Sequence, residues 1–323
     1  MVAKIMQKGQ IKKLIRQEDG LFEKAYKLAA QKPLVLSAPF IMTRSCQVTP
    51  LCRYCNWRAY RGVMKNYGNA KISKKEAISR SLRIKQSGVD YIHILSGWMG
   101  TVLPIYFFDY IADMKKNTGL KIIADFAAVN RQDLITLKEI GVDCVSCSLE
   151  TTNIGIFRAL KPGDSYEARL KTLQDAKELG LKTATNLIIG LGESIDDIDT
   201  SIRLAEELSL SLLSMTSFVP TPFTETETWG RPKPYFVATV VAAARICMPY
   251  LDIAASFGCD NTSVNYAWGI KCGANTFSVA LRNPQETPAL VGDELSNIQT
   301  MWEDSKTINK NKVTPPTLVK RRK

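Results

Sequence analysis

Histidine is almost absent from this chain of 323 residues, which contains only His93. A zinc site of the common paired Cys and His type therefore has few ligands to draw on. The chain also lacks a run of about 18 apolar residues and an apolar segment near its first residue, so we expect neither a membrane span nor a signal peptide. These absences predict a reducing, cytoplasmic setting, in which the eight cysteines form no structural disulfides.

Acidic residues are in the minority, because 31 Asp and Glu stand against 43 Lys and Arg and the formal net charge is +12. Such a chain binds either a polyanion or small anionic molecules. Much of the excess lies near the ends, in Lys12, Lys13, Arg16 and the tail at 320–323, where it is typical of a solvated face. Interleaved basic and aromatic residues, which mark a nucleic-acid surface, are missing. We expect no nucleic-acid partner.

Three cysteines, Cys46, Cys52 and Cys55, lie within ten residues and are separated by five and then two residues. Three thiolates on one loop can bind three irons of a cubane cluster and leave the fourth iron open to a chelating ligand. A zinc site needs a fourth ligand, and no second pair with metal-ligand spacing accompanies the loop. The loop therefore favours an iron–sulfur cluster. The alternative is a nucleic-acid-binding protein with a structural metal knuckle.

The rest of the chain alternates helical segments with apolar strands. A glycine suited to a left-handed helix end precedes each of four strands, at Gly88, Gly119, Gly141 and Gly180. Further strands are expected at 33–43, 212–219, 252–257 and 274–281. This repeat predicts an α/β fold, a (βα)8 barrel of the TIM type.

The chain divides into three predicted parts. Residues 1–32 are expected to form an N-terminal helical cap at the bottom of the fold, 33–304 the barrel, and 305–323 a basic, flexible tail. In such a barrel the chemistry gathers where strands end, and the cysteine loop follows the first strand. Cys144 and Cys147 are three apart on a strand and face opposite sides, so we interpret them as packing residues.

Several further segments lie at predicted strand ends, one lies early in a predicted helix, and two lie later in the chain. Taken in order with the cysteine loop, they resemble the radical S-adenosylmethionine (SAM) enzymes, in the branch of biotin synthase and the [FeFe]-hydrogenase maturase. The resemblance covers about residues 34–282 and includes Leu-Ser-Gly-Trp at 95–98, Ser-Leu-Glu-Thr at 148–151, Tyr-Glu-Ala-Arg-Leu at 166–170, Ile-Ile-Gly-Leu-Gly-Glu at 188–193, Ser-Met-Thr-Ser-Phe-Val-Pro at 214–220, and the segments 243–249 and 272–277. A single such motif is weak, but the ordered set is specific.

The resemblance implies that Cys46, Cys52 and Cys55 are the catalytic cysteines and bind a [4Fe-4S] cluster. It also implies a set of contacts to SAM: Tyr54 beside the adenine, Ser96 and Gly97 at the methionine amino group, Ser148 and Glu150 at the ribose or amino group, Arg169 at the methionine carboxylate, and backbone of Leu187 to Gly192, with Met215 and Val219, around the adenine.

The activity implied by the resemblance is reductive cleavage of SAM to methionine and a 5′-deoxyadenosyl radical. That radical then abstracts hydrogen from a small-molecule substrate. An external electron donor of the flavodoxin or ferredoxin type would reduce the cluster.

Two departures from the branch narrow this expectation. The cysteines that hold the second cluster of biotin synthase have no counterparts, and Gly258-Cys259-Asp260 stands where its arginine ligand would be. The five-and-two spacing is similar to that of the HmdB/HcgA-type proteins, which are linked to assembly of the iron-guanylylpyridinol cofactor of [Fe]-hydrogenase. The alternative is another biosynthetic enzyme of the same branch, similar to methylornithine synthase or to the hydrogenase maturase.

Overall fold

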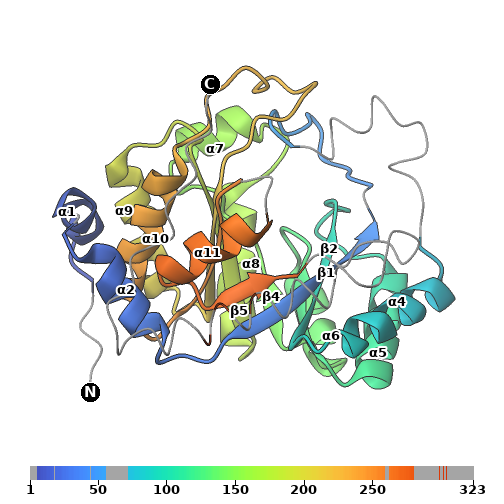
Figure 1. Ribbon diagram of the computed structural model, residues 1–323. Helices are drawn as coiled ribbons and strands as arrows, with labels where there is room; N and C mark the ends of the chain where they lie inside the picture. Colours follow the sequence, from blue (N-terminus) through green and yellow to red (C-terminus); the bar gives the residue numbers. More distant parts are fainter. Residues whose placement is uncertain are drawn as a thin grey trace.

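The structure is a computed structural model that describes residues 6–17, 19–43, 45–55, 72–258 and 262–279, with Ile298, Met301 and Glu303. Within these residues, eight parallel strands close into a barrel in the order of the sequence (Figure 1). They are β1 (Val35–Thr43), β2 (Tyr91–Ser96), β3 (Lys121–Asp125), β4 (Cys144–Ser146), β5 (Lys182–Ile189), β6 (Leu212–Ser217), β7 (Asp252–Ser256) and β8 (Thr276–Ser278). The predicted TIM-type (βα)8 barrel is confirmed.

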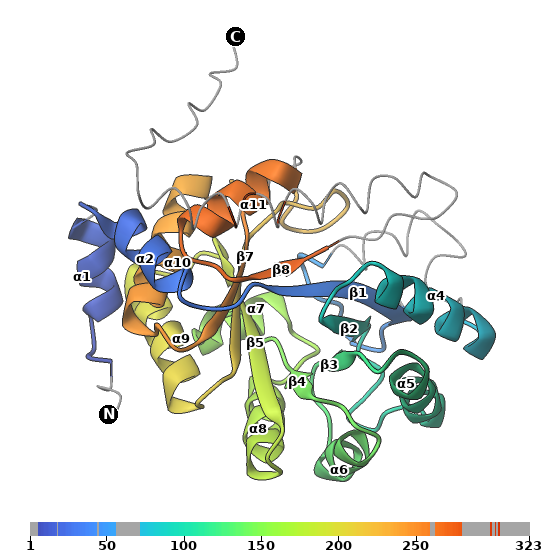
Figure 2. The ribbon, with the colours of Figure 1, turned by 60° about the horizontal axis from the view of Figure 1, so that its bottom comes forward.

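Helices pack around the outside of this barrel (Figure 2). They are α1 (Gln10–Gln17), α2 (Leu21–Ala29), α4 (Lys74–Gln86), α5 (Ile105–Thr118), α6 (Arg131–Glu139), α7 (Ile154–Leu160), α8 (Tyr166–Glu178), α9 (Ile195–Glu207), α10 (Pro234–Cys247) and α11 (Thr262–Lys271). Gly119 ends α5 with a φ of 67°, so the left-handed junction predicted there is present.

Alternate side chains of each strand face the helices and the barrel interior. On β2, Ile92 and Ile94 are fully buried among the helices, whereas the side chain of His93 keeps 25% of its surface exposed. An apolar cluster closes the interior near the beginnings of the strands, and its members are Ile123, Cys144 and Ala184 with Tyr91 and Leu212. Cys147 instead packs in the main core, as expected for a residue on the opposite face from Cys144.

The first two helices lie on the outer flank of the helical layer, where α1 packs against α9 and α10 and α2 against α10 and α11 (Figure 2). The carboxylate of Asp199 in α9 accepts hydrogen bonds from the backbone N–H groups of Gly9 and Ile11, at 2.9 and 3.0 Å. This carboxylate caps the first turn of α1. The N-terminal helices thus pack on α9, α10 and α11, and their role as a cap at the bottom of the fold stays a prediction.

Arg245, in the segment 243–249, has a structural role. Its guanidinium is fully buried and donates to the carbonyl oxygens of Gly273 and Leu251, at 2.7 and 2.6 Å, and to the Asn275 side chain at 2.7 Å. Burial lowers the pKa of Arg245 to about 10. These bonds tie α10 to the segments around β7 and β8.

No helix in the described part of the chain combines the length and the apolar character needed to cross a membrane. The expected basic tail at 305–323 and Cys259 lie outside the described residues.

Candidate active site

The cysteine loop follows β1 and lies against the ends of other strands. The backbone N–H of Gln47 donates to the carbonyl of Trp98 at 2.7 Å, and that of Arg53 donates to the carbonyl of Leu160 at 2.8 Å. A Cβ on Gly97 would stand 2.0 Å from the carbonyl oxygen of Ser45, so only glycine lets the loop pass. The side of Gly97 on which a Cβ would stand is therefore filled by the loop, beside Cys46, and the contact of Gly97 with the methionine amino group stays a prediction.

The three loop cysteines fit a cluster better than a single ion. Cys52 is buried, while Cys46 and Cys55 are half-buried. No three His, Cys, Asp or Glu side chains of the described residues are arranged to hold one metal ion. A cubane places different demands on its ligands, because each thiolate binds a different iron and the sulfurs need not converge on one point.

Cluster binding requires the thiolate form of these cysteines. Burial raises the pKa of the Cys52 thiol to about 11, and the ammonium of Lys161 acts in the opposite direction. A buried cation beside a buried thiol therefore favours the form that binds iron.

Buried polar atoms without partners border the loop. The Tyr54 hydroxyl, the Ser96 hydroxyl and the Trp98 indole nitrogen are buried and make no hydrogen bond within the part of the chain that the structure describes. Buried polar groups nearly always have a partner in the functional state of a protein. Their position beside the cysteine loop fits a polar ligand held there, and SAM has groups that could satisfy them.

A buried charge cluster, formed by Glu150, Lys161, Asp164 and Arg169, lies next to the loop. Arg169 donates from Nε and Nη2 to the two carboxylate oxygens of Asp164, at 3.0 and 2.7 Å. Lys161 Nζ lies 3.3 Å from Glu150 Oε1 and 3.4 Å from Asp164 Oδ2. Each of these four side chains keeps at most 11% of its surface exposed.

Arg169 was expected to present its planar fork to a ligand carboxylate. The structure places it at the strand ends as expected, but the fork is occupied by Asp164, and Nη1 donates to the backbone carbonyl of Ser148. Nη1 also lies 3.7 Å from Glu150 Oε1. Nη1 is therefore the guanidinium nitrogen that Asp164 leaves to other partners.

Electrostatics keep Arg169, Asp164 and Lys161 charged. Burial opposes the charge of Arg169, yet Asp164 outweighs it and raises the pKa of Arg169. Burial raises the pKa of Asp164, but Arg169 and Lys161 lower it below the usual range. Burial and Arg169 also oppose the charge of Lys161, while neighbours that include Glu150 raise its pKa above the ordinary value.

Glu150 has a strained backbone, with a φ of 65°. Its N–H donates to the carbonyl of Asn186 at 2.9 Å, and its own carbonyl accepts from the N–H of Ile188 at 2.8 Å. These bonds extend the pairing of β4 and β5 beyond the regular strand and fix the carboxylate next to Lys161. A non-glycine residue held in this region is typical of functional sites.

Lys161 and Asp164 were not among the residues that the sequence indicated. They lie in the turn between α7 and α8, where a Cβ on Gly163 would stand 2.3 Å from the carbonyl oxygen of Pro50 in the cysteine loop. Lys161 Nζ is 5.8 Å from the centre of the Tyr54 ring. The Pro-Gly pair after Lys161 signalled a turn, but nothing in the sequence indicated that this turn packs on the cysteine loop.

The residues expected around the adenine differ in which of their atoms are available to a ligand. Leu187 and Met215 turn their side chains into the helical layer, so only their backbone is available to a ligand. Val219 is half-buried beside Gly258. Of the two glycines after β5, Gly190 is covered by Pro232, whereas Gly192 is open, with no atom within 4 Å of the position that a Cβ would take.

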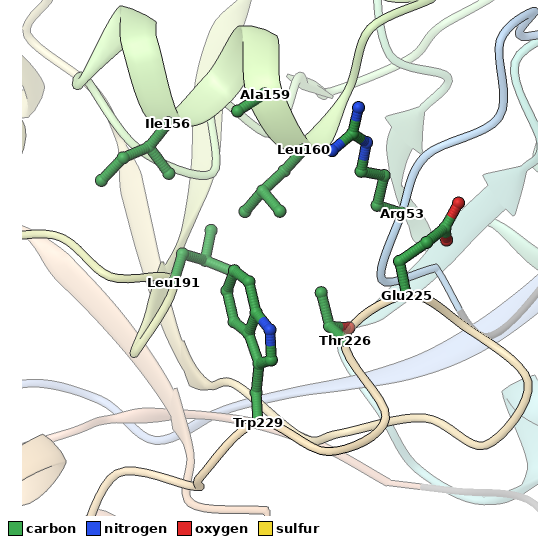
Figure 3. A pocket seen from close by; sticks show the side chains of 8 residues that line it. All are labelled: Arg53, Ile156, Ala159, Leu160, Leu191, Glu225, Thr226 and Trp229. Atoms are coloured by element: carbon green, nitrogen blue, oxygen red, sulfur yellow. The ribbon is translucent and has the colours of Figure 1, made fainter.

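A pocket of about 220 Å³ adjoins the loop (Figure 3). Arg53 of the cysteine loop and Glu225 form one side, and the walls are mostly apolar. The lining residues are Arg53, Ile156, Ala159, Leu160, Leu191, Glu225, Thr226 and Trp229. Leu160 and Leu191 belong to a small core cluster against which Tyr54 also packs, so the pocket and the Tyr54 ring share one apolar wall.

Comparisons with known proteins agree with this geometry. The sequence profile of the radical SAM superfamily matches residues 40–205, just over half of the chain. An uncharacterized protein of Methanocaldococcus jannaschii is 25% identical over 227 residues, 69% of this chain and 60% of that protein. The [FeFe] hydrogenase maturase subunit HydE of Thermotoga maritima is 29% identical over 208 residues, 64% of this chain and 58% of HydE. The chain thus spans about three fifths of the length of these curated relatives.

Among solved structures, methylornithine synthase (PylB) superposes with a TM-score of 0.74 at 18% identity, covering 85% of this chain and 82% of that one. This likeness concerns the fold. The profile match covers the cysteine loop and the strands up to β5, and so includes the charge cluster. The chain belongs to the radical SAM superfamily, whose members use a [4Fe-4S] cluster and SAM.

Proposed function

We propose that this chain is an enzyme that cleaves SAM reductively at a [4Fe-4S] cluster bound by Cys46, Cys52 and Cys55, and then abstracts hydrogen from a small-molecule substrate. The observation that carries the proposal is the position of the cysteine loop. It lies over the strand ends of a closed barrel, beside buried polar atoms that have no partner among the described residues.

When bound, the cluster supplies one electron to the sulfonium of SAM, so that the C–S bond breaks and methionine and a 5′-deoxyadenosyl radical form. The chain's own residues bind and orient SAM. Tyr54 contacts the adenine, Ser96 and Gly97 the methionine amino group, and Ser148 and Glu150 the ribose or amino group. The barrel excludes water from the reacting atoms.

Arg169 binds the methionine carboxylate through Nη1, which is not bonded to Asp164. Exchange of the Ser148 carbonyl for a carboxylate would strengthen the hydrogen bond of this nitrogen, because both partners are then charged. The backbone of Leu187 to Gly192, with Met215 and Val219, frames the adenine. The exposure of Gly192 supports this part of the proposal.

The substrate is proposed to be a precursor of the iron-guanylylpyridinol cofactor of [Fe]-hydrogenase. The five-and-two cysteine spacing supports this placement. A flavodoxin- or ferredoxin-type protein would reduce the cluster. If the substrate lies elsewhere, the chain is another biosynthetic enzyme of the branch that includes HydE and biotin synthase.

The test is anaerobic reconstitution followed by reduction with dithionite in the presence of SAM. We expect 5′-deoxyadenosine and methionine in equal amounts from the wild type, and neither from Cys46→Ala, Cys52→Ala or Cys55→Ala. Cys144→Ala is the matched control and should keep both the cluster and the cleavage. A wild type that carries a complete cluster but leaves SAM intact would refute the proposal.

Deuterium-labelled pyridinol precursors then test the substrate. Transfer of deuterium into 5′-deoxyadenosine supports the assignment to iron-guanylylpyridinol assembly. Cleavage of SAM without such transfer leaves the enzyme class in place and removes that substrate class.

A further inference from the structure

We propose that the interior wall of the barrel binds a protonated amino group of the substrate, through Asp125 and Asn186 with His93 and Ser146 as their support. The proposal rests on the proposed function, because the bound molecule would be the substrate of the SAM-derived radical. It adds the chemical group by which that substrate is recognised.

The four residues share the interior face of adjoining strands. Asp125 on β3 is the register partner of Ser146 on β4, and Ser146 is the partner of Ala184 on β5, two residues before Asn186. His93 on β2 lies beside Ile123, two residues before Asp125. Because side chains two apart share a face, all four lie on the same side of the sheet as the apolar cluster that closes the interior.

Hydrogen bonds fix the Asp125 carboxylate in place. Its Oδ2 accepts from the Ser146 hydroxyl at 3.0 Å and lies 3.2 Å from His93 Nε2. Within the described residues, Oδ1 makes no hydrogen bond. The Asp125 side chain keeps 17% of its surface exposed and that of His93 25%, although both lie on the interior face of a closed barrel. This carboxylate therefore has a free oxygen in a place that solvent reaches.

Asn186 supplies a second acceptor. Its amide nitrogen donates to the Thr216 hydroxyl at 3.2 Å, which orients the side chain. Its Oδ1 is buried and has no hydrogen-bond partner in the described part of the structure. A buried acceptor without a donor is costly unless a ligand satisfies it.

The charge of the wall decides the class of ligand. The described strands contain only two Lys or Arg residues, Lys121 and Lys182, and both are first residues of their strands at the closed end of the barrel. Above the apolar cluster, the described strands thus present the carboxylate of Asp125 and no lysine or arginine; His93 is the one basic side chain there, and it is paired with Asp125. A protonated amine has three donors and no acceptor, so it matches a wall that offers a carboxylate oxygen and an amide oxygen. A carboxylate on the ligand would meet repulsion there.

The test measures binding of three four-carbon probes to the reconstituted full chain by titration calorimetry: 1,4-diaminobutane, 1,4-butanediol and succinate. We expect the diamine to bind in preference to both others. Asp125→Asn should weaken diamine binding about ten- to a hundredfold, as expected for loss of a charge-assisted hydrogen bond. The control Asp113→Asn removes a carboxylate that pairs with Lys74 on the outer surface, and should leave binding unchanged.

Three further variants keep the proposal testable if Asp125→Asn folds poorly. Asn186→Asp adds a second carboxylate to the wall and should strengthen diamine binding. His93→Gln keeps a donor for Asp125 and should retain binding, whereas His93→Leu removes the donor and should weaken it. A purely structural role for His93 would make the two variants alike in binding.

The proposal is overturned if the diamine fails to bind, if succinate binds as well as the diamine, or if Asp125→Asn leaves diamine binding unchanged. SAM affinity and cluster absorbance are measured on the same samples, and Asp125→Asn should alter neither. SAM cleavage without diamine binding refutes this inference alone. Absence of a cluster refutes the proposed function, while the probe titration still decides whether the wall selects amines.

Discussion

Arg169 and Asp164 form a buried bidentate ion pair, in which Nε–Oδ1 and Nη2–Oδ2 are 3.0 and 2.7 Å apart and the two side chains keep 6% and 4% of their surface exposed. The pair joins the turn after α7 to the start of α8. Lys161 lies 3.4 Å from the same carboxylate. Asp164 is thus the anion on which two buried cations of the site depend.

Asp164→Asn should lower the free energy of unfolding by about 3–5 kcal/mol at neutral pH, because it leaves two buried cations short of a partner. Urea unfolding under anaerobic conditions measures the change. Glu23→Gln removes the partner of an exposed lysine, Lys27, and serves as the control that should scarcely alter stability. If Asp164→Asn loses no more free energy of unfolding than Glu23→Gln, the buried ion pair contributes little to stability.

The same variant has a predictable pH dependence. Burial raises the pKa of Asp164, but Arg169 and Lys161 outweigh it, so the folded-state pKa lies below that of the unfolded chain, which is about 3.9. The ionised carboxylate therefore stabilises the fold fully above that value, and its contribution is lost as pH falls through the folded-state pKa. The difference between wild type and Asp164→Asn should be constant from pH 5 to 8, about the range where the carboxylate is ionised in both states, and should shrink below about pH 4. A difference that grows in acid would contradict the sign of this shift.

Arg169→Lys should raise the dissociation constant of SAM about ten- to a hundredfold. Lysine keeps the charge beside Asp164 but lacks the planar fork, so it cannot serve Asp164 and a ligand carboxylate together. The figure follows from about 1.5–3 kcal/mol for a charge-assisted hydrogen bond. Titration calorimetry measures it, and Arg158→Lys at an exposed pair with Glu167 is the control. If Arg169→Lys and Arg158→Lys bind SAM with equal affinity, Arg169 is not part of the SAM site.

Lys161→Met should make the cluster harder to reduce. Lys161 is the nearby cation that acts most strongly on Cys52, and a positive charge favours the reduced, more negative cluster. An interaction of about 1–2 kcal/mol at an effective dielectric constant near 20 corresponds to a fall of roughly 40–90 mV in the midpoint potential. Redox titration followed by electron paramagnetic resonance measures it.

The control for that titration is Lys171→Met, which removes an exposed lysine that pairs with Asp175. Its potential should equal that of the wild type. An unchanged potential in Lys161→Met would show that the ammonium is too far from the cluster, or too well screened, to act on it.

The order of helices and strands was predictable because the chain repeats one local signal. Apolar strands follow helix-ending glycines, and the first residues of β2, β3, β4 and β5 lie two or three residues after Gly88, Gly119, Gly141 and Gly180. The cysteine loop was predictable for a similar reason, since its spacing is a local property. These features need no knowledge of which segments meet in space.

The buried charge cluster could not be predicted in this way. Asp164 looks like an ordinary turn residue, and only the packing of the turn at Gly163 on the cysteine loop reveals its role. Gly97 is a second case, because its sequence context indicated a close approach to a ligand but gave no sign of the close approach of Ser45 that the structure shows. Long-range packing decides both cases.

Arg245→Met should destabilise the fold by about 2–5 kcal/mol, because it leaves buried carbonyl oxygens of Gly273 and Leu251 without their donor. Cluster content per folded chain and SAM affinity should stay at wild-type values, since the residue lies among α10, β7 and β8. Urea unfolding measures the stability, iron analysis the cluster content, and titration calorimetry the SAM affinity. Normal stability with a lost cluster would place Arg245 in the site instead of the scaffold.

The most direct test of the central claim is the electron paramagnetic resonance spectrum of the reduced, reconstituted protein with and without SAM. We expect about four irons per chain, in one cubane whose fourth iron is open. Addition of SAM should therefore change the g-values of the reduced cluster in the wild type. Spectra that are identical with and without SAM, or a chain that holds zinc and no cluster, would contradict the account.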